Sequence, residues 1–101
     1  LWHGYRGALG FADILVDDGA PARGAHPCDH CLDKPCLDAC PIDAVAPAGF
    51  DVQRCRTHLR TDEGQRGCMA AGCRARNACP VGASYRYPAA QLAFHIAALQ
   101  L

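Results

Sequence analysis

The sequence lacks several features that would place the chain in common functional classes. No apolar run approaches the ~20 residues that a membrane-spanning helix needs, and no secretory signal is visible. The formal net charge is zero, so the overall charge gives no reason to expect binding to nucleic acid or to a membrane surface. We therefore expect no membrane insertion and no nucleic-acid partner, and we expect the protein in the cytoplasm.

Catalytic patterns are also missing. No Ser, His and Asp residues form a recognisable triad pattern, and no glycine pattern follows a strand as a phosphate-binding loop requires. Asp13, Asp17 and Asp18 are better explained as solvated charge at a helix end than as an acid/base pair. We therefore expect no catalytic residues and no small-molecule substrate.

Large aliphatic side chains are scarce for a chain of 101 residues. The sequence has 19 alanines but only 16 leucine, isoleucine and valine residues, and alanine buries little apolar area. A domain of this size has a marginal apolar core, and such domains are commonly stabilised by disulfides or metals. The composition therefore points to the cysteines as an additional source of stability.

Cysteine is abundant, and its spacing is the strongest pattern in the sequence. Eight cysteines fall into two runs, each of which ends in Cys-Pro. The first run is Cys28, Cys31, Cys36 and Cys40-Pro41, and the second is Cys55, Cys68, Cys73 and Cys79-Pro80. Two such runs are typical of proteins that hold two iron–sulfur clusters. We therefore predict two 4Fe–4S clusters as the cofactors.

The expected ligand sets exchange one cysteine between the two runs. In two-cluster ferredoxins the fourth cysteine of a run binds the other cluster. The first cluster would then be held by Cys28, Cys31, Cys36 and Cys79, and the second by Cys40, Cys55, Cys68 and Cys73. This crossing would tie both halves of the chain into one body, so neither half is expected to fold alone.

Three other uses of the cysteines remain open at this point. Two zinc sites would also take eight thiolates, but structural zinc favours paired Cys-x2-Cys spacing, and only Cys28 and Cys31 have it. Four disulfides would suit a secreted scaffold with an even cysteine count. A single catalytic cysteine is the weakest alternative, because nothing in the sequence distinguishes one cysteine from the rest.

Charge and histidine positions give two weaker indications. Residues 1–50 carry seven acidic against three basic residues, and residues 51–101 carry three acidic against seven basic residues. This asymmetry is either ordinary surface charge or a dipolar surface that orients a redox partner. His30 lies inside the first run and His58 follows Cys55 by three residues, so each is either a surface histidine or a donor beside a cluster.

The motifs resemble those of known iron–sulfur families. The segment Cys28-x2-Cys31-x4-Cys36-x3-Cys40-Pro41, with Pro35 before the third cysteine, resembles a motif in the iron–sulfur subunits of molybdopterin oxidoreductases. The wider pattern is similar to that of bacterial two-cluster 4Fe–4S ferredoxins. The second half resembles the iron–sulfur domain of epoxyqueuosine reductase and reductive dehalogenases, through Asp51…Cys55, Gly72-Cys73 and Cys79-Pro80. The resemblance implies electron transfer, without the reaction of epoxyqueuosine reductase, whose corrinoid-binding domain this sequence does not contain.

The expected fold is a small α+β, ferredoxin-like two-cluster domain of loops and short helices, with added N- and C-terminal helices. Residues 1–27 would form a helix and a loop that pack on the cluster domain, which would comprise residues 28–83, and residues 84–101 would form a docking helix. Periodicity and cap residues predict helices within 2–16 and over 36–40, 52–59, 68–77 and 89–101, a strand near 44–45 and a loop over 61–67.

These observations predict an electron-transfer protein and not an enzyme. The protein would relay single electrons between redox partner proteins through two 4Fe–4S clusters. One alternative is that the chain is the electron-feeding module of a larger reductase. A further alternative is a zinc-stabilised interaction domain, which metal analysis would distinguish.

Overall fold

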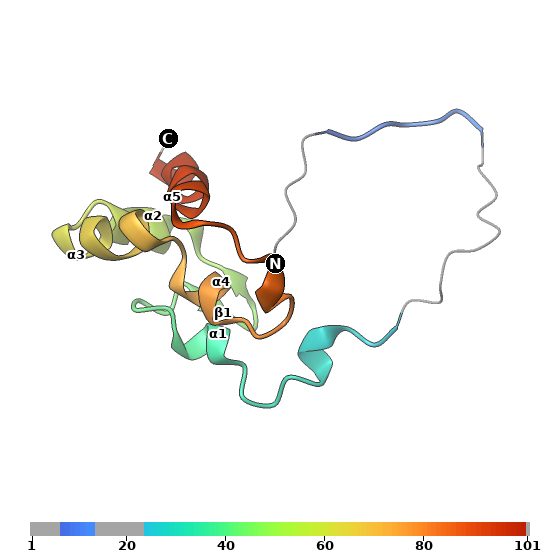
Figure 1. Cartoon of the computed structure of the whole chain (residues 1–101), viewed down its shortest axis with the longest axis horizontal. Coiled ribbons are helices and arrows are strands. Elements are labelled where there is room, and N and C mark those ends of the chain that lie inside the picture. The colour runs from blue at the N-terminus through green and yellow to red at the C-terminus, as the bar shows by residue number, and fades with distance from the viewer. Residues whose placement is uncertain (1–6, 14–23, 101) are drawn as a thin grey trace.

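The computed structural model describes residues 7–13 and 24–100, and within them the chain forms short helices and one small sheet (Figure 1). In chain order the elements are η1 (Pro27–Asp29), α1 (Pro35–Asp38), β1 (Val45–Ala46), β2 (Gly49–Phe50), α2 (Val52–Leu59), α3 (Asp62–Gly64), η2 (Gln65–Met69), α4 (Arg74–Ala78), η3 (Ala83–Tyr85), α5 (Ala89–Ala97) and η4 (Ala98–Gln100). Of these, η1, η3 and η4 are 3-10 turns, and η2 is π-helical.

Two helices begin at or beside the residues that the sequence indicates. Pro35 opens α1, one residue before the predicted start, where its missing N–H would have no intrahelical partner, and the single turn ends at Asp38, two residues before the predicted end at 40. Asp51 caps α2, because its carboxylate accepts the N–H of Arg54 at 2.9 Å. The predicted helix over 52–59 is therefore confirmed at both ends.

The sheet is a two-residue antiparallel hairpin that leads into α2. Val45 pairs with Phe50 and Ala46 with Gly49, so the predicted strand near 44–45 is displaced by one residue. The partner strand was not predicted, because it contains Gly49 and glycine has a low strand propensity. Gly49 adopts a φ of 141°, a conformation that glycine permits.

The predicted loop over 61–67 is wrong, because the segment is helical. The hydroxyl of Thr61 accepts the N–H of Gly64 at 3.1 Å and thereby caps α3. Gly64 lies against the backbone of His58, where any side chain would collide with the His58 carbonyl. The amide of Gln65 donates to the carbonyl of Leu59 at 2.6 Å, so tertiary contacts fix this polar stretch as helix.

The predicted helix over 68–77 is interrupted. Gly72 has a φ of 85°, which ends the helical turn after Ala71, and α4 begins anew at Arg74. Gly72 also packs closely on Leu92 of α5, and this contact joins the two halves of the interrupted segment to the C-terminal helix.

The C-terminal helix carries part of the small apolar core. Helix α5 buries Leu92 and Ile96, whereas Phe94 is 75% exposed because it lies off that face. Leu59, Cys68 and Ile96 form the centre of the core. The amide of Gln100 in η4 donates to the carbonyl of Leu59 at 3.3 Å and ties the end of the chain to α2.

The predicted N-terminal helix within 2–16 is not found where it can be assessed. Residues 7–13 contain no helix, and the remainder of the prediction lies outside the described residues. Leu9 and Phe11 are largely exposed, so no buried partner stabilises a helix against the cost of Gly7 and Gly10. The predicted docking of this segment on the cluster domain therefore has no support in residues 7–13.

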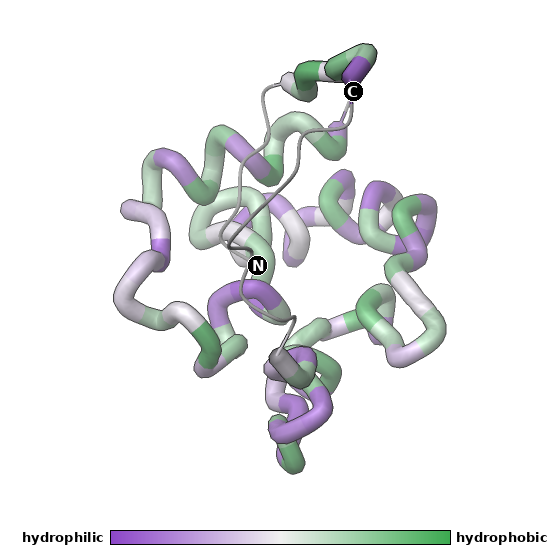
Figure 2. Tube along the Cα trace, turned by 90° about the vertical axis from the view of Figure 1, so that its right-hand side faces the viewer, coloured by the Kyte–Doolittle hydropathy of each residue, from purple (hydrophilic) through white to green (hydrophobic). Residues whose placement is uncertain are grey.

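Apolar and polar residues are interspersed along the helices (Figure 2). Among the described residues, none of the helices has the length and apolar character needed to cross a bilayer.

Candidate metal centre

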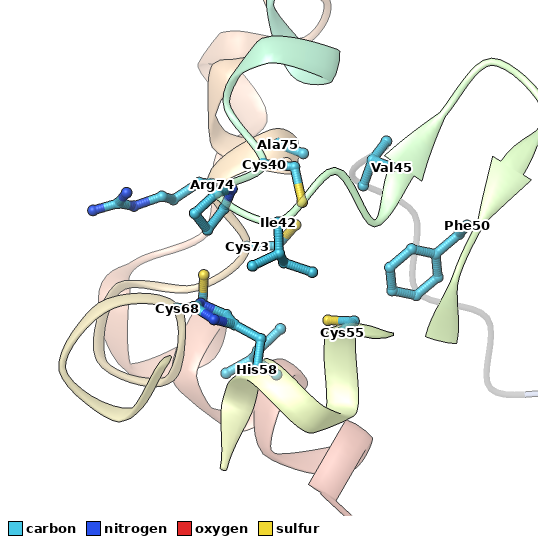
Figure 3. A pocket seen from close by; sticks show the side chains of 12 residues that line it. Cys40, Ile42, Val45, Phe50, Cys55, His58, Cys68, Cys73, Arg74 and Ala75 are labelled. Atoms are coloured by element: carbon cyan, nitrogen blue, oxygen red, sulfur yellow. The ribbon is translucent and has the colours of Figure 1, made fainter. Parts of the chain in front are cut away.

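Four cysteine side chains from four separate parts of the chain line one hollow. Cys40 follows α1, Cys55 lies on α2, Cys68 lies in the π-helical η2, and Cys73 precedes α4. Figure 3 shows their sulfur atoms directed toward a common space. These are the four residues that the sequence assigns to the second cluster, and the fold brings them together across 33 positions of chain.

The rest of the wall is almost wholly apolar. It comprises Pro41, Ile42, Val45, Phe50, Ala75 and Ile96, with His58 and Arg74 as the two polar residues (Figure 3). The apolar core of the fold is continuous with this wall, because Cys55 and Cys73 pack against Leu59, Cys68 and Ile96. The hollow therefore lies within the main core and is shielded on several sides from water.

The hollow disfavours free thiolates when nothing neutralises them. Burial raises the pKa of Cys55, and the neighbouring Cys73, Cys68 and Cys40 raise it further. Burial likewise raises the pKa of Cys68, while a hydrogen bond from the backbone of Arg74 acts in the opposite direction. A cationic centre bound between the sulfurs would remove the mutual repulsion of the thiolates.

Two sulfur atoms accept hydrogen bonds from the backbone. The N–H of Ala44 donates to Cys40 Sγ at 3.3 Å, and Cys68 accepts the backbone hydrogen bond from Arg74. Backbone N–H donors of this kind stabilise sulfur that carries negative charge. Neither donor could be predicted from the sequence, because both depend on how the chain turns after Cys40 and after Gly72.

The four cysteines assigned to the first cluster do not line this hollow. Cys36 is half-buried on α1, and Cys79 is buried directly after α4. Helices α1 and α4 pack against each other, so the elements that carry these two residues are neighbours. Cys28 is exposed in η1, which stands away from both helices in Figure 1, and Cys31 is half-buried in the loop between.

The two histidines singled out in the sequence differ sharply in environment. His30 is exposed, whereas His58 is only 9% exposed and lines the hollow between Cys55 and Cys68. His58 also borders a second, open hollow on the protein surface, formed with Ile42, Asp43, Arg54, Thr57 and Thr61. His58 and Ile42 therefore separate the thiol hollow from solvent on that side.

All eight cysteines are free thiols, so the disulfide alternative finds no support in the structure. Within residues 7–13 and 24–100, no three His, Cys, Asp or Glu side chains stand close enough to bind a single metal ion.

Comparison with known proteins yields no match to a protein-family model, to a curated protein or to a solved structure. The function of the chain therefore has to be inferred from its own residues.

Proposed function

We propose that the chain is an electron-transfer protein that holds two 4Fe–4S clusters and relays single electrons between partner proteins. The observation that carries the proposal is the convergence of Cys40, Cys55, Cys68 and Cys73 on one apolar hollow. Four thiols in such a hollow suit a cubane cluster, which takes four cysteine thiolates. The first cluster is assigned to Cys28, Cys31, Cys36 and Cys79.

Two further observations support a cluster at the hollow. Backbone N–H groups already point at two of its sulfurs, as hydrogen bonds to cluster sulfurs require. The apolar wall limits access of water, which is one of the factors that set the potential of a cluster.

The roles of the protein follow from this arrangement. A bound 4Fe–4S cluster would accept and release one electron, while the four cysteines hold it and the wall of the hollow restricts water. We propose no substrate for this protein beyond the electron that it relays. Ile42 and His58 border both the thiol hollow and the open surface hollow, so we propose this side as the exit for electrons toward a partner protein in the cytoplasm.

Anaerobic purification followed by iron, zinc and labile-sulfide analysis tests the proposal. We expect about eight iron and eight sulfide per chain, as two cubane clusters contain. On addition of dithionite, the visible absorption of the clusters should bleach. The electron-spin resonance spectrum should gain the signals of reduced 4Fe–4S clusters. Zinc without iron or sulfide would overturn the proposal and favour the interaction domain.

A further inference from the structure

The turn after Cys40 contains a residue in an unusual backbone conformation. Asp43 has a φ of 51°, in the left-handed region that non-glycine residues seldom enter. Aspartate and asparagine tolerate this region better than other residues with a side chain. Asp43 is exposed and forms part of the wall of the open surface hollow, so packing around its side chain does not explain the conformation.

The conformation of Asp43 decides where the next N–H points. Pro41 and Ile42 form a turn that is closed by the N–H of Asp43 donating to the carbonyl of Cys40 at 3.3 Å. The left-handed residue then bends the chain back, and the N–H of Ala44 donates to Cys40 Sγ at 3.3 Å. Two successive N–H groups therefore face the same cysteine, one its carbonyl and the other its sulfur.

Ala44 is held by hydrogen bonds on both sides, through its N–H and through its carbonyl.

 Ala44 is 1% exposed, and its carbonyl accepts the N–H of Asp51 at 2.8 Å. If residue 43 moved to the ordinary right-handed or extended region, the N–H of Ala44 would turn away from the sulfur while remaining in a buried position. A buried N–H without a partner is strongly disfavoured, so the conformations of residues 43 and 44 are coupled.

We propose that Asp43 is a positioning residue for the centre in the thiol hollow: its left-handed backbone aims the Ala44 N–H at Cys40 Sγ and thereby raises the reduction potential there. The inference rests on the proposed function, because it concerns the cluster that Cys40 would help to bind. A hydrogen bond to the sulfur stabilises the more negative, reduced form and so raises the potential. The carboxylate of Asp43 acts in the opposite direction, because negative charge disfavours reduction.

The backbone hydrogen bond and the carboxylate shift the reduction potential in opposite directions, so a comparison of Asp43→Asn with Asp43→Ala separates the two effects. Both variants remove the charge, but asparagine tolerates the left-handed region and alanine does not. Asp43→Gly serves as a second control, because glycine enters the region without cost and also lacks the charge. The measurement is a redox titration of the anaerobic, cluster-loaded protein, with dithionite as the one-electron reductant and the spectra followed cluster by cluster.

We expect the Asp43→Asn and Asp43→Gly proteins to have similar potentials for the cluster in the hollow, at or slightly above that of the unaltered protein. The Asp43→Ala protein should have a lower potential than both, by about tenfold in the equilibrium constant for reduction, which is about 59 mV for one electron. The potential of the other cluster should not change. If only Asp43→Ala fails to retain the cluster, the requirement for the left-handed backbone is likewise supported.

Equal potentials in the Asn, Gly and Ala variants, with both clusters present, would overturn this inference and leave the proposed function intact. Equal loss of the cluster in all three would also overturn it, since the carboxylate and not the backbone would then be the essential feature. Absence of iron and sulfide from the unaltered protein would instead remove the proposed function and this inference with it.

Discussion

Gly72 lies so close to Leu92 that a Cβ atom at position 72 would come within 2.7 Å of the Leu92 Cβ. The same glycine has a φ of 85°, which other residues rarely adopt. Gly72 thus both ends a helical turn and allows α5 to pack closely through Leu92. It also fixes the direction of Cys73, the next residue in the chain and one of the four thiols of the hollow.

The contact predicts that Gly72→Ala destabilises the fold. The left-handed backbone costs about 1–2 kcal/mol for a residue with a Cβ, and overpacking against Leu92 adds about 1–3 kcal/mol. Thermal or denaturant unfolding of the loaded protein measures the loss. Gly67→Ala is the matched control, because a Cβ there meets nothing within 4 Å, and we expect it to be neutral or stabilising by up to about 1 kcal/mol. Equal stabilities for the two variants would contradict the prediction.

The crossed ligand sets predict which single variants share a spectrum. Cys40→Ser should leave the same remaining cluster signal as Cys55→Ser, although the two cysteines belong to different runs. Cys79→Ser should match Cys36→Ser, because both would remove a ligand of the first cluster. Electron-spin resonance spectra of the four reduced variants make the comparison. A match of Cys40→Ser with Cys36→Ser, or of Cys79→Ser with Cys55→Ser, would refute the crossing.

The cap of α2 predicts a smaller and more local effect. Asp51→Ala removes the carboxylate that accepts the Arg54 N–H at 2.9 Å, which should cost about 1 kcal/mol of stability. Asp51→Asn keeps an acceptor at the same place and should remain close to the unaltered protein. Denaturant midpoints measured side by side provide the test, and a loss of the same size in both variants would show that the cap is not the cause.

The raised thiol pKa values predict how the metal-free protein responds to pH. Burial and neighbouring thiols raise the pKa of Cys55 and Cys68 in the folded chain, so above the pKa of a free thiol, about 8.5, the folded state binds more protons than the unfolded state. The stability these protons confer is fully present below that pH and is lost as the pH rises through the folded-state pKa values. Denaturant unfolding under reducing conditions between pH 7 and about 10 should show the decline.

The same experiment has an internal control. Replacing both residues, as Cys55→Ala with Cys68→Ala, should flatten the decline, because the two titrating groups are gone. A metal-free protein whose stability rises over this range, or a decline that the double variant leaves unchanged, would rule out these two thiols as its source.

Local signals in the sequence fixed the elements whose ends depend on nearby residues. Asp51 marked the start of α2 through its own carboxylate, and Pro35 marked the start of α1. The segment over 61–67 was misjudged because its helix is secured by distant groups, such as the Leu59 carbonyl that Gln65 reaches. Residues 7–13 show the reverse case, since apolar periodicity without a buried partner did not make a helix.

The sequence by itself determined the cysteine inventory, the two Cys-Pro runs and the prediction that Cys40 belongs with thiols of the second run. Only the tertiary structure decided that four of these thiols face one apolar hollow, that His58 closes it, and that Ala44 donates to Cys40. The physical reason is the range of the interactions. Spacing along a chain constrains which residues can meet, but the direction of a sulfur or an N–H depends on the backbone angles at Asp43 and Gly72 and on packing between elements far apart in sequence.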